Sequence, residues 1–303
     1  MTSAAQDRPD LSGRVAIVTG AGKGLGRTYA LELARAGAAV VVNNRRHPGE
    51  ADEDTSAART VAEIEAAGGR AVADWSAVQD PDSGTSMVSR AMEAFGRLDI
   101  VVANAAAPQA RSFHKLTLDE FRSVFDVGFL GTLHLMHAAW PILREQGYGR
   151  VIMTSSSAGR YGQHGMSAYG ASKSAVDSLV RTLAAEGGSK GICVNGVSPY
   201  AATPMTAGHI EGAMAEAFVP ERVAPLVLWL ASEGCSVNGS ILVAGGGRFR
   251  MVETAETVSL ARENGFDAMI EQLKDAPRKA HPSSNRAFDT LLVECGFEPR
   301  TPA

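Results

Sequence analysis

The chain has 303 residues, of which 45% are hydrophobic and 20% charged, a balance that allows a large buried core. The net charge of −4 gives no indication of a basic surface, so nucleic acid is not an expected partner. No stretch reaches the roughly 18 apolar residues that span a membrane, and residues 1–10 lack the apolar segment of a secretory signal. Three scattered cysteines without metal-type spacing fit a reduced compartment, and we expect a cytoplasmic protein without a metal site.

Short apolar runs alternate with helical stretches along most of the chain. The run at 15–19 is rich in β-branched residues and stops at a glycine, which is typical of a strand buried on both faces. Further strands are expected at 39–43, 71–73, 100–103, 151–154, 193–197 and 241–244. Helices are expected up to residue 36 and over 57–67, 86–95, 118–129, 133–146, 169–185 and 222–230. This alternation predicts an α/β fold, a Rossmann-type doubly wound parallel sheet with helices on both faces.

The composition changes after the glycine run at 245–247. We expect a flexible tail over 1–10, a Rossmann-type domain over 11–250 and a C-terminal helical extension over 251–303. The extension is more charged than the domain and is interrupted by prolines. We expect it to pack on the domain or on a neighbouring subunit.

A glycine-rich turn follows the first expected strand, with the sequence TGAGKGLG over residues 19–26. Glycine lets the backbone approach a pyrophosphate, and the N–H groups at the start of the next helix point at the anion. A glycine cluster alone is a weak signal, because many are only tight turns, and the spacing departs from G-x-G-x-x-G. Its position between a buried strand and a helix favours dinucleotide binding.

The end of the second expected strand distinguishes the two nicotinamide cofactors. A carboxylate there binds the ribose 2′-hydroxyl of NAD, whereas the 2′-phosphate of NADP requires positive charge. This chain has Asn44 and Arg45 at that point and no acid, and Lys23 is a second basic position. A guanidinium matches a phosphate in a bidentate manner. The alternative is that Arg45 and Arg46 are only solvated loop charges, and we favour NADP(H) over NAD(H).

The strongest signal for chemistry is the pair Tyr169 and Lys173. Positions i and i+4 share one face of a helix, so both side chains can reach the same point. A phenol with a pKa of about 10 is a poor base at neutral pH, but a neighbouring ammonium stabilises the phenolate. Such pairs occur often by chance. Ser156 makes this one specific, because it lies thirteen residues upstream at the end of an expected strand, and Ser155 is the competing serine.

With these motifs together, the sequence resembles the short-chain dehydrogenase/reductase family. The pattern T-G-x-x-x-G-x-G assigns Gly20, Gly24 and Gly26 to the phosphate turn. The resemblance implies that Tyr169 is the general acid/base and that Lys173 binds the nicotinamide ribose and tunes the tyrosine. It implies further cofactor contacts from Lys23, Leu25, Asn44, Arg45, Val78, Asn104, Ala105, Tyr169, Pro199 and Ala202.

The family also assigns Ser156 to the substrate oxygen, where a donor stabilises developing charge. Two departures from the family pattern stand out. Asn104 matches the second asparagine of the N-N-A-G segment, but alanines replace the first asparagine and the glycine. Gly128 stands where many members carry an asparagine that holds a water for proton relay to the lysine. Either other groups hold a water chain, or proton delivery is slower or lost.

The likeness extends to the dehydrogenase unit of peroxisomal multifunctional enzymes of type 2. It rests on YGRVIMTSS at 148–156, PYAATPMT at 199–206 and VAPLVLWL at 223–230, and it covers roughly residues 11–250. That group oxidises (3R)-hydroxyacyl-CoA and accepts some hydroxysteroids, which implies a bulky or thioester substrate entering near 201–210. The group has an acid at the second-strand end, which this chain lacks.

These features predict an enzyme that interconverts a secondary alcohol and a ketone by hydride transfer to or from NAD(P). The expected substrate is a 3-hydroxyacyl or 3-oxoacyl thioester, a steroid-like molecule or another bulky ketone. His164 and Tyr200 join Ser156 as candidate substrate contacts. The resemblance implies a homodimer or homotetramer. The alternatives are a lyase-like or non-redox use of the same pocket and a non-catalytic cofactor-binding scaffold.

Overall fold

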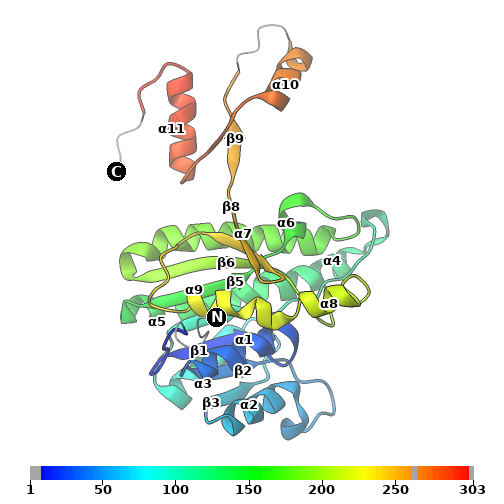
Figure 1. Ribbon diagram of the computed structural model, residues 1–303, viewed down its shortest axis with the longest axis vertical. Coiled ribbons are helices and arrows are strands. Elements are labelled where there is room, and N and C mark those ends of the chain that lie inside the picture. The colour runs from blue at the N-terminus through cyan, green and yellow to red at the C-terminus, as the bar shows by residue number, and fades with distance from the viewer. Residues whose placement is uncertain (1–7, 261–264, 300–303) are drawn as a thin grey trace. The chain divides into compact units, whose positions relative to one another are not determined.

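The computed structural model describes residues 8–260 and 265–299, so most of the predicted tail over 1–10 lies outside the described residues. The chain divides into two compact units, Met1–Met251 and Val252–Ala303 (Figure 1). Within the described ranges, none of the helices combines the length and the apolar character needed to cross a membrane.

The first unit is built on an eight-stranded sheet with the order β3-β2-β1-β4-β5-β6-β7-β8. Neighbouring strands from β3 to β7 all run parallel. The strands are β1 (Val15–Thr19), β2 (Ala39–Asn43), β3 (Arg70–Asp74), β4 (Ile100–Ala103), β5 (Gly149–Thr154), β6 (Ile192–Tyr200), β7 (Ile241–Gly245) and β8 (Arg248–Val252). The order reverses between β1 and β4, which confirms the predicted Rossmann-type, doubly wound sheet.

Helices cover both faces of this sheet (Figure 1). The α-helices are α1 (Gly24–Arg35), α2 (Ser56–Ala66), α3 (Ser83–Phe95), α4 (Leu118–Phe125), α5 (Gly131–Gln146), α6 (Ser157–Tyr161), α7 (Ser167–Gly187), α8 (Ala213–Ala217) and α9 (Ala224–Leu230). A π-helical turn at Asp126–Leu130 joins α4 to α5, and short 3-10 turns lie at Asp52–Asp54, Phe113–Lys115, Gly188–Lys190 and Pro220–Arg222. The helix α1 packs against α2 and α9, whereas α3 packs against α5 and α4 against α7.

The sequence explains these elements locally. Every residue of β1, β2 and β4 is buried, because apolar residues fill both faces of a parallel strand. The helix α4 begins with a capping box, in which the Thr117 hydroxyl accepts from Glu120 N at 3.2 Å and the Glu120 carboxylate accepts from Thr117 N at 2.9 Å. The core lies between α1, α9 and the sheet, with Tyr29 and Leu33 of α1 fully buried in it.

The strand β8 and the helices α6 and α8 are absent from the sequence expectations. Gly246 and Gly247 separate β7 from β8 and have φ values of 57° and 74°. Positive φ at both central residues is the signature of a type I′ hairpin turn. The helices α6 and α8 have five residues each, too short to show a helical period in the sequence.

The second unit contains the predicted helices and also a β-ribbon. Its helices are α10 (Phe266–Asp275) and α11 (Ser284–Glu294). The strands β9 (Ala255–Thr257) and β10 (Arg278–Ala280) pair antiparallel, so the unit is not purely helical. Strands of three residues are too short for an alternation pattern, which is why the sequence did not indicate them.

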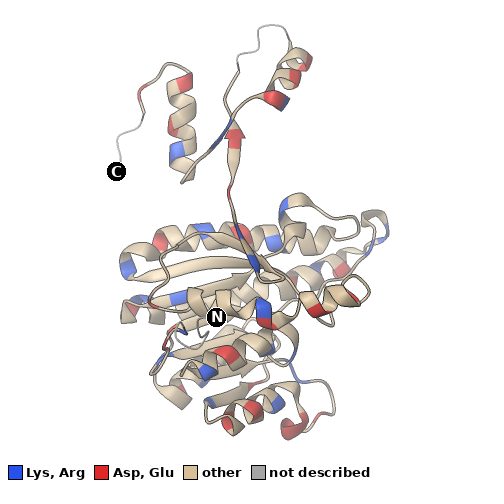
Figure 2. Ribbon diagram, in the orientation of Figure 1, with Lys and Arg blue, Asp and Glu red and all other residues tan. Residues whose placement is uncertain are grey.

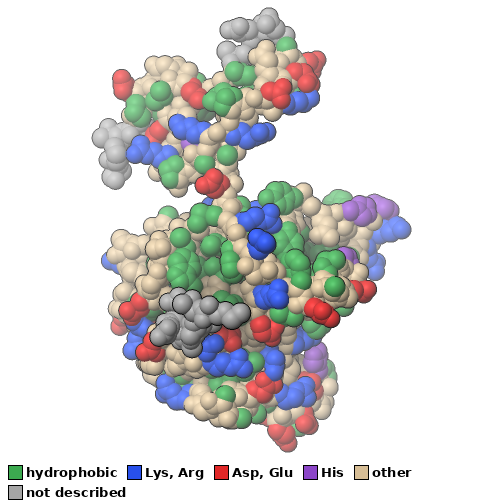
Figure 3. Space-filling view, in the orientation of Figure 1, with side chains coloured by type: hydrophobic (Ala, Val, Ile, Leu, Met, Phe, Trp, Pro, Cys, Tyr) green, Lys and Arg blue, Asp and Glu red, His purple; other side chains and the backbone are tan. Residues whose placement is uncertain are grey.

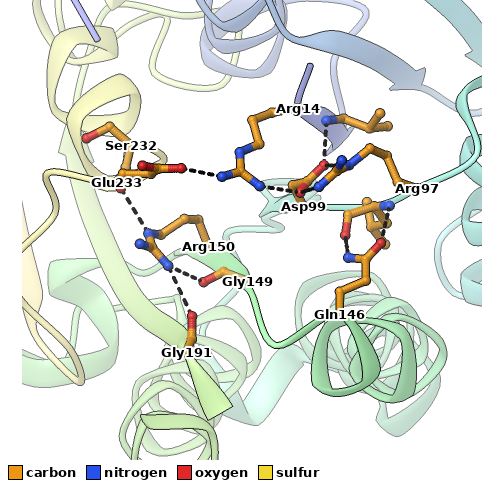
Figure 4. Close-up of polar contacts among 11 residues, drawn as sticks. Arg14, Arg97, Asp99, Gln146, Gly149, Arg150, Gly191, Ser232 and Glu233 are labelled. Carbon is orange, nitrogen blue, oxygen red and sulfur yellow. Dashed lines mark hydrogen bonds and ion pairs between the residues drawn. The ribbon is translucent and has the colours of Figure 1, made fainter. Parts of the chain in front are cut away.

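A polar network ties the N-terminal ends of the central strands together (Figure 4). The Asp99 carboxylate is fully buried and accepts a hydrogen bond from Val15 N at 3.0 Å. It also accepts from Arg14 at 2.9 Å and from Arg97 at 2.7 and 2.8 Å. Arg14 forms a further ion pair with Glu233. Because Asp99 directly precedes β4 and Val15 begins β1, the carboxylate links the two strands between which the order reverses.

A second part of the network is built around an aromatic ring. Tyr148 lies between two guanidinium groups, with Arg14 Cζ at 3.8 Å and Arg150 Cζ at 4.5 Å from the ring centroid. Arg150 is itself buried and donates to the carbonyl oxygens of Ser232 at 2.9 Å and Gly191 at 3.2 Å (Figure 4). The loops after α9 and before β6 are thereby joined to the start of β5.

We expect Asp99→Asn to lower the free energy of unfolding by about 1–3 kcal/mol, because the buried carboxylate that accepts from Val15 N, Arg14 and Arg97 is replaced by an amide with only one acceptor oxygen. Chemical denaturation of the full-length chain measures this loss. Asp119→Asn is the control, since it breaks the exposed ion pair of 3.3 Å with Arg122 and should change stability little. Equal losses in both variants would contradict the role given to Asp99.

Candidate active site

The candidate site lies at the C-terminal ends of the central strands. Four strands contribute there, since β1 leads into the glycine turn, β4 into Asn104, β5 into Ser156 and β6 into residues 201–206. In open parallel sheets, the crevice next to the order reversal is where ligands bind. The topology therefore brings together segments that are up to 180 residues apart in the sequence.

The glycine turn has the close packing that a phosphate-binding turn requires. Gly20 and Gly24 have φ values of 63° and 55°, in the region that favours glycine. A Cβ at Gly26 would collide with the carbonyl oxygen of Gly20, and one at Gly22 with the Ser56 side chain. The helix α1 starts at Gly24, and its N-cap Lys23 makes no side-chain capping bond. The first-turn N–H groups are therefore available to an anion, and these residues fit a pyrophosphate.

Some of the polar and basic side chains near this turn are bound to other residues, and others are free. Asn44 donates to Ser56 Oγ at 2.8 Å at the side of the turn. Arg46 is engaged, because it pairs with Asp52 and its Cζ lies 5.0 Å from the centroid of the Trp75 ring. Arg45 and Lys23 are exposed, and neither side chain has a hydrogen bond or ion pair within the described part of the chain. These two are the basic groups free to meet a phosphate.

Asn104 braces the sheet at the order reversal. Its amide Nδ2 donates to Thr19 O at 3.0 Å, and its Oδ1 accepts from Thr154 Oγ1 at 3.3 Å. The Thr19 hydroxyl accepts from the backbone N–H groups of Asn104 and Ala105 at 2.9 and 3.0 Å. One asparagine thus connects the ends of β1, β4 and β5.

The remaining predicted cofactor residues lie around the same edge. Val78 is buried, and its carbonyl accepts from Ser83 Oγ at 2.9 Å. Leu25 packs against the core, and Pro199 pairs with Ala244 in the sheet. Ala202 N donates to Phe218 O at 2.7 Å, which holds the segment after β6 in place.

The structure brings Tyr169, Lys173 and Ser156 together. The Ser156 side chain lies beside the Tyr169 hydroxyl and acts to lower the pKa of the phenol. Lys173 Nζ lies 5.7 Å from the centroid of the Tyr169 ring, on the same face of α7. The Ser155 hydroxyl instead accepts from Arg160 at 3.0 Å, so of the two serines it is Ser156 that faces the tyrosine.

Lys173 is the most deeply buried charged group of the site. Its side chain is 1% exposed, and Nζ donates to the carbonyl oxygen of Thr154 at 2.8 Å. Burial lowers the pKa of Lys173 to about 8, while the charge of Asp177 acts in the opposite direction. Burial raises the pKa of Tyr169 above its ordinary value, and the Ser156 side chain partly offsets this effect. An ammonium and a phenol with shifted pKa values therefore lie side by side on α7.

Gly128 lies in the π-helical turn and is buried against α7. A Cβ at this position would come within 2.6 Å of Ser172 Oγ. The Ser172 hydroxyl donates to Tyr169 O at 2.8 Å, so it occupies the space next to Gly128 and supports the backbone of α7. A larger side chain at position 128 would require Ser172 to move.

The two candidate substrate residues are His164, in the loop between α6 and α7, and Tyr200, at the end of β6. His164 Nε2 is 3.2 Å from Ser112 Oγ, and His164 lines an open groove between the loop at 112–114 and α6–α7. That groove is not lined by Ser156, Tyr169 or Lys173. Tyr200 ends β6 and is 39% exposed. Within the described residues, no cluster of histidine, cysteine and carboxylate side chains suits a metal ion.

Sequence reasoning missed several residues that shape the site. Thr19 and Thr154 supply the hydroxyl and carbonyl groups that hold Asn104 and Lys173. A Cβ on Gly24 would lie 3.6 Å from Thr203, so the segment after β6 reaches the glycine turn. A threonine at the end of a strand gives little indication of its role in the sequence, because the residues that it holds are distant along the chain.

The family model for short chain dehydrogenases matches residues 14–212. A short-chain type dehydrogenase/reductase of Mycobacterium tuberculosis is 41% identical over 246 residues, which cover 80% of this chain and 86% of the relative. The crystal structure of a short chain dehydrogenase from Mycobacterium avium matches with a TM-score of 0.78 at 36% identity, covering 90% of this chain and 98% of that one.

Peroxisomal multifunctional enzyme type 2 of Mus musculus is 38% identical over 285 residues. The match covers 93% of this chain and 38% of the mouse enzyme, so the chain spans well under half of that relative. This similarity confirms the resemblance indicated by residues 148–156 and 223–230. The chain belongs to the short-chain dehydrogenase/reductase family, a family of oxidoreductases.

Proposed function

We propose that this protein interconverts a secondary alcohol and a ketone with NAD(P)(H) as the redox partner. The observation that carries the proposal is that the Tyr169 hydroxyl lies beside Ser156, with the buried Lys173 Nζ 5.7 Å from the centroid of the tyrosine ring. The glycine turn and the start of α1 would hold the pyrophosphate, and the bound nicotinamide supplies or accepts the hydride.

The protein's own groups handle the proton. Because burial raises the pKa of Tyr169, the phenol is protonated at neutral pH and can donate to a carbonyl oxygen. Ser156 holds the same oxygen and stabilises the charge that develops on it. The Lys173 ammonium stabilises the phenolate that remains after proton donation. In the oxidation direction, the phenolate takes the proton from the alcohol.

Tyr169→Phe should lower turnover of any accepted ketone by about 10²–10⁴-fold, because it removes the proton donor. Cofactor binding should change little, since the ring remains. The matched control is Tyr161→Phe, which alters a tyrosine of α6 that is 80% exposed. Steady-state kinetics and cofactor titration measure the two effects. Unchanged turnover in Tyr169→Phe would refute the assignment.

The same assays separate the alternative functions. A non-catalytic scaffold would bind NADPH but transfer no hydride with any ketone or 3-oxoacyl thioester. A lyase-like enzyme would convert substrate without a change in nicotinamide absorbance. The complete set of Ser156, Tyr169 and Lys173 favours the redox reaction.

We propose a bulky ketone or a 3-oxoacyl thioester as the substrate, with a steroid-like molecule as the other member of this class. Support comes from the similarity to peroxisomal multifunctional enzyme type 2. The end of β6 and the segment after it expose Tyr200, Met205 and Met214, which offer apolar contact to an acyl chain or a ring system. Screening both substrate types with NADPH and NADH in parallel tests this choice.

We propose NADP(H) as the preferred cofactor, because Arg45 and Lys23 are basic, exposed and free of intramolecular ion pairs in the described structure. Arg45→Gln should weaken NADPH binding by about tenfold and leave NADH binding nearly unchanged. Arg46→Gln is the matched control, since Arg46 is already held by Asp52 and Trp75. Equal NADPH affinity in wild type and Arg45→Gln would reject Arg45 as the phosphate ligand.

A small molecule is the proposed partner, and nucleic acid is not. Basic and acidic positions are interspersed along the helices of the first unit in Figure 2, rather than gathered in a basic stripe. We also propose a homodimer or homotetramer. The space-filling view shows hydrophobic side chains exposed on one face of the first unit (Figure 3), and Phe113 is 74% exposed.

A further inference from the structure

The short helix α6 lies directly against the backbone of α7. A Cβ on Gly159 of α6 would lie 2.8 Å from Ser174 N and 2.9 Å from the carbonyl carbon of Lys173. On the facing side, a Cβ on Gly170 of α7 would lie 3.0 Å from Ala158 O. The distance between packed helices depends on the side chains at the contact, so glycine at these two positions allows the backbones to touch.

Hydrogen bonds fix α6 in this position. The Ser174 hydroxyl of α7 donates to the carbonyl oxygen of Gly159. The guanidinium of the next residue, Arg160, donates to Ser155 Oγ at 3.0 Å and to Ser198 Oγ at 2.8 Å. Ser155 directly follows β5, and Ser198 lies near the end of β6. The helix α6 is therefore held both to α7 and to the strand ends beside the site.

The spacing of the two helices sets the positions of the proposed reacting groups. Ser156 is the N-cap of α6, since its hydroxyl oxygen accepts from Ala158 N at 3.2 Å and its carbonyl oxygen accepts from Gly159 N at 3.1 Å. The backbone of α7 that faces Gly159 is that of Lys173, and Tyr169 lies one helical turn before this lysine. Any movement of α6 away from α7 would therefore carry Ser156 away from Tyr169.

We propose that Gly159 is a positioning residue for the reaction. The absence of a side chain at this position lets α6 approach α7 closely enough to hold Ser156 at its working distance from Tyr169. Gly159 acts through Ser156 and takes no part in the chemistry. This inference rests on the proposed function, because it takes Ser156 and Tyr169 as the groups that hold the substrate oxygen.

Steric exclusion gives the mechanism of this effect. Alanine at position 159 would place a methyl group within 3.0 Å of backbone atoms of α7. No change of rotamer relieves this contact, because a Cβ is fixed by the backbone and the atoms that it meets belong to the main chain. The two helices must therefore move apart. Ser156 and Tyr169 have to reach one substrate oxygen together, and a displacement of about 1 Å can cost about 10²-fold in rate.

The test compares Gly159→Ala with Gly188→Ala in the full-length chain. Gly188 is the matched control, because it has helical backbone angles and a Cβ there would lie 3.4 Å from Asn238 Nδ2, with no closer atom among the described residues. For a ketone that the wild type accepts, kcat, KM and the dissociation constant of NADPH are measured, and kcat is expressed per NADPH-binding site. Crystal structures of the wild type and Gly159→Ala give the distance from Ser156 Oγ to Tyr169 Oη.

A second pair of variants adds no volume to the contact. Ser174→Ala removes the hydroxyl that binds Gly159 O. Ser178→Ala, which alters an exposed serine one helical turn further along α7, is its control. This pair keeps the inference testable if Gly159→Ala does not fold.

Gly159→Ala should lower kcat by about 10- to 100-fold and lengthen the distance from Ser156 Oγ to Tyr169 Oη. KM should change less than kcat, because the lost contact matters most in the transition state. The dissociation constant of NADPH should change by less than about twofold, because the glycine turn and α1 hold the pyrophosphate. Ser174→Ala should lower kcat by about two- to fivefold, since it removes one hydrogen bond from the contact. Both controls should match the wild type.

A kcat per NADPH-binding site equal to that of Gly188→Ala, with only the melting temperature lowered, would show a purely structural contact and overturn the inference. A reduced kcat with Ser156 and Tyr169 at the wild-type distance would also overturn it. If Gly159→Ala does not fold, a kcat of Ser174→Ala equal to that of Ser178→Ala overturns it. If the wild-type chain transfers no hydride, the proposed function fails, while the distance in the Gly159→Ala crystal still decides whether Gly159 positions Ser156.

Discussion

The burial of the Lys173 ammonium is the constraint on which the candidate site depends. An isolated charge in the interior costs several kcal/mol, so the fold must bring a compensating group to it. The Thr154 carbonyl does so from the end of β5, and Asp177 does so from within α7. The hydrogen bond to the Thr154 carbonyl holds Lys173, and with it α7, against the end of β5. Tyr169, one turn before the lysine, is thereby placed against Ser156, two residues beyond β5.

Buried polar groups lie at both ends of the central strands, and they have a different role at each end. At the N-terminal edge, the buried side chains of Asp99 and Arg150 bind the backbone of neighbouring segments and hold the strands together. At the C-terminal edge, Asn104 and Lys173 are held by strand-end threonines. The strands between these edges are apolar on both faces. Because the strands between the two edges are closely packed and rigid, fixing them at the N-terminal edge also fixes the positions of the residues at the C-terminal edge.

Features that depend on residues close together in the sequence could be predicted from it. The bounds of β1, β2 and β4 match the expected strands because fully buried strands leave uninterrupted apolar runs. The glycine turn and the Tyr169–Lys173 pair were also visible, since their spacing is short. The Arg160–Asp177 pair was not, because neither residue breaks a local rule and only the packing of α6 on α7 brings them together. The ribbon strands of the second unit have three residues each, too few to show an alternation, and β8 is largely exposed and therefore leaves no apolar run in the sequence.

Ser172 occupies the space beside Gly128, where the sequence departs from the family pattern. In the family pattern that the sequence resembles, the helix before β5 sends an asparagine toward the lysine by way of water. Here the π-helical turn carries no side chain at that position, and the Ser172 hydroxyl fills the adjacent space while bound to the backbone of α7. The turn can therefore give Lys173 no polar side chain from Gly128. Asp177, one turn further along the lysine's own helix, favours the charged form of Lys173 through its negative charge, and it pairs with Arg160 of α6 at 3.3 Å.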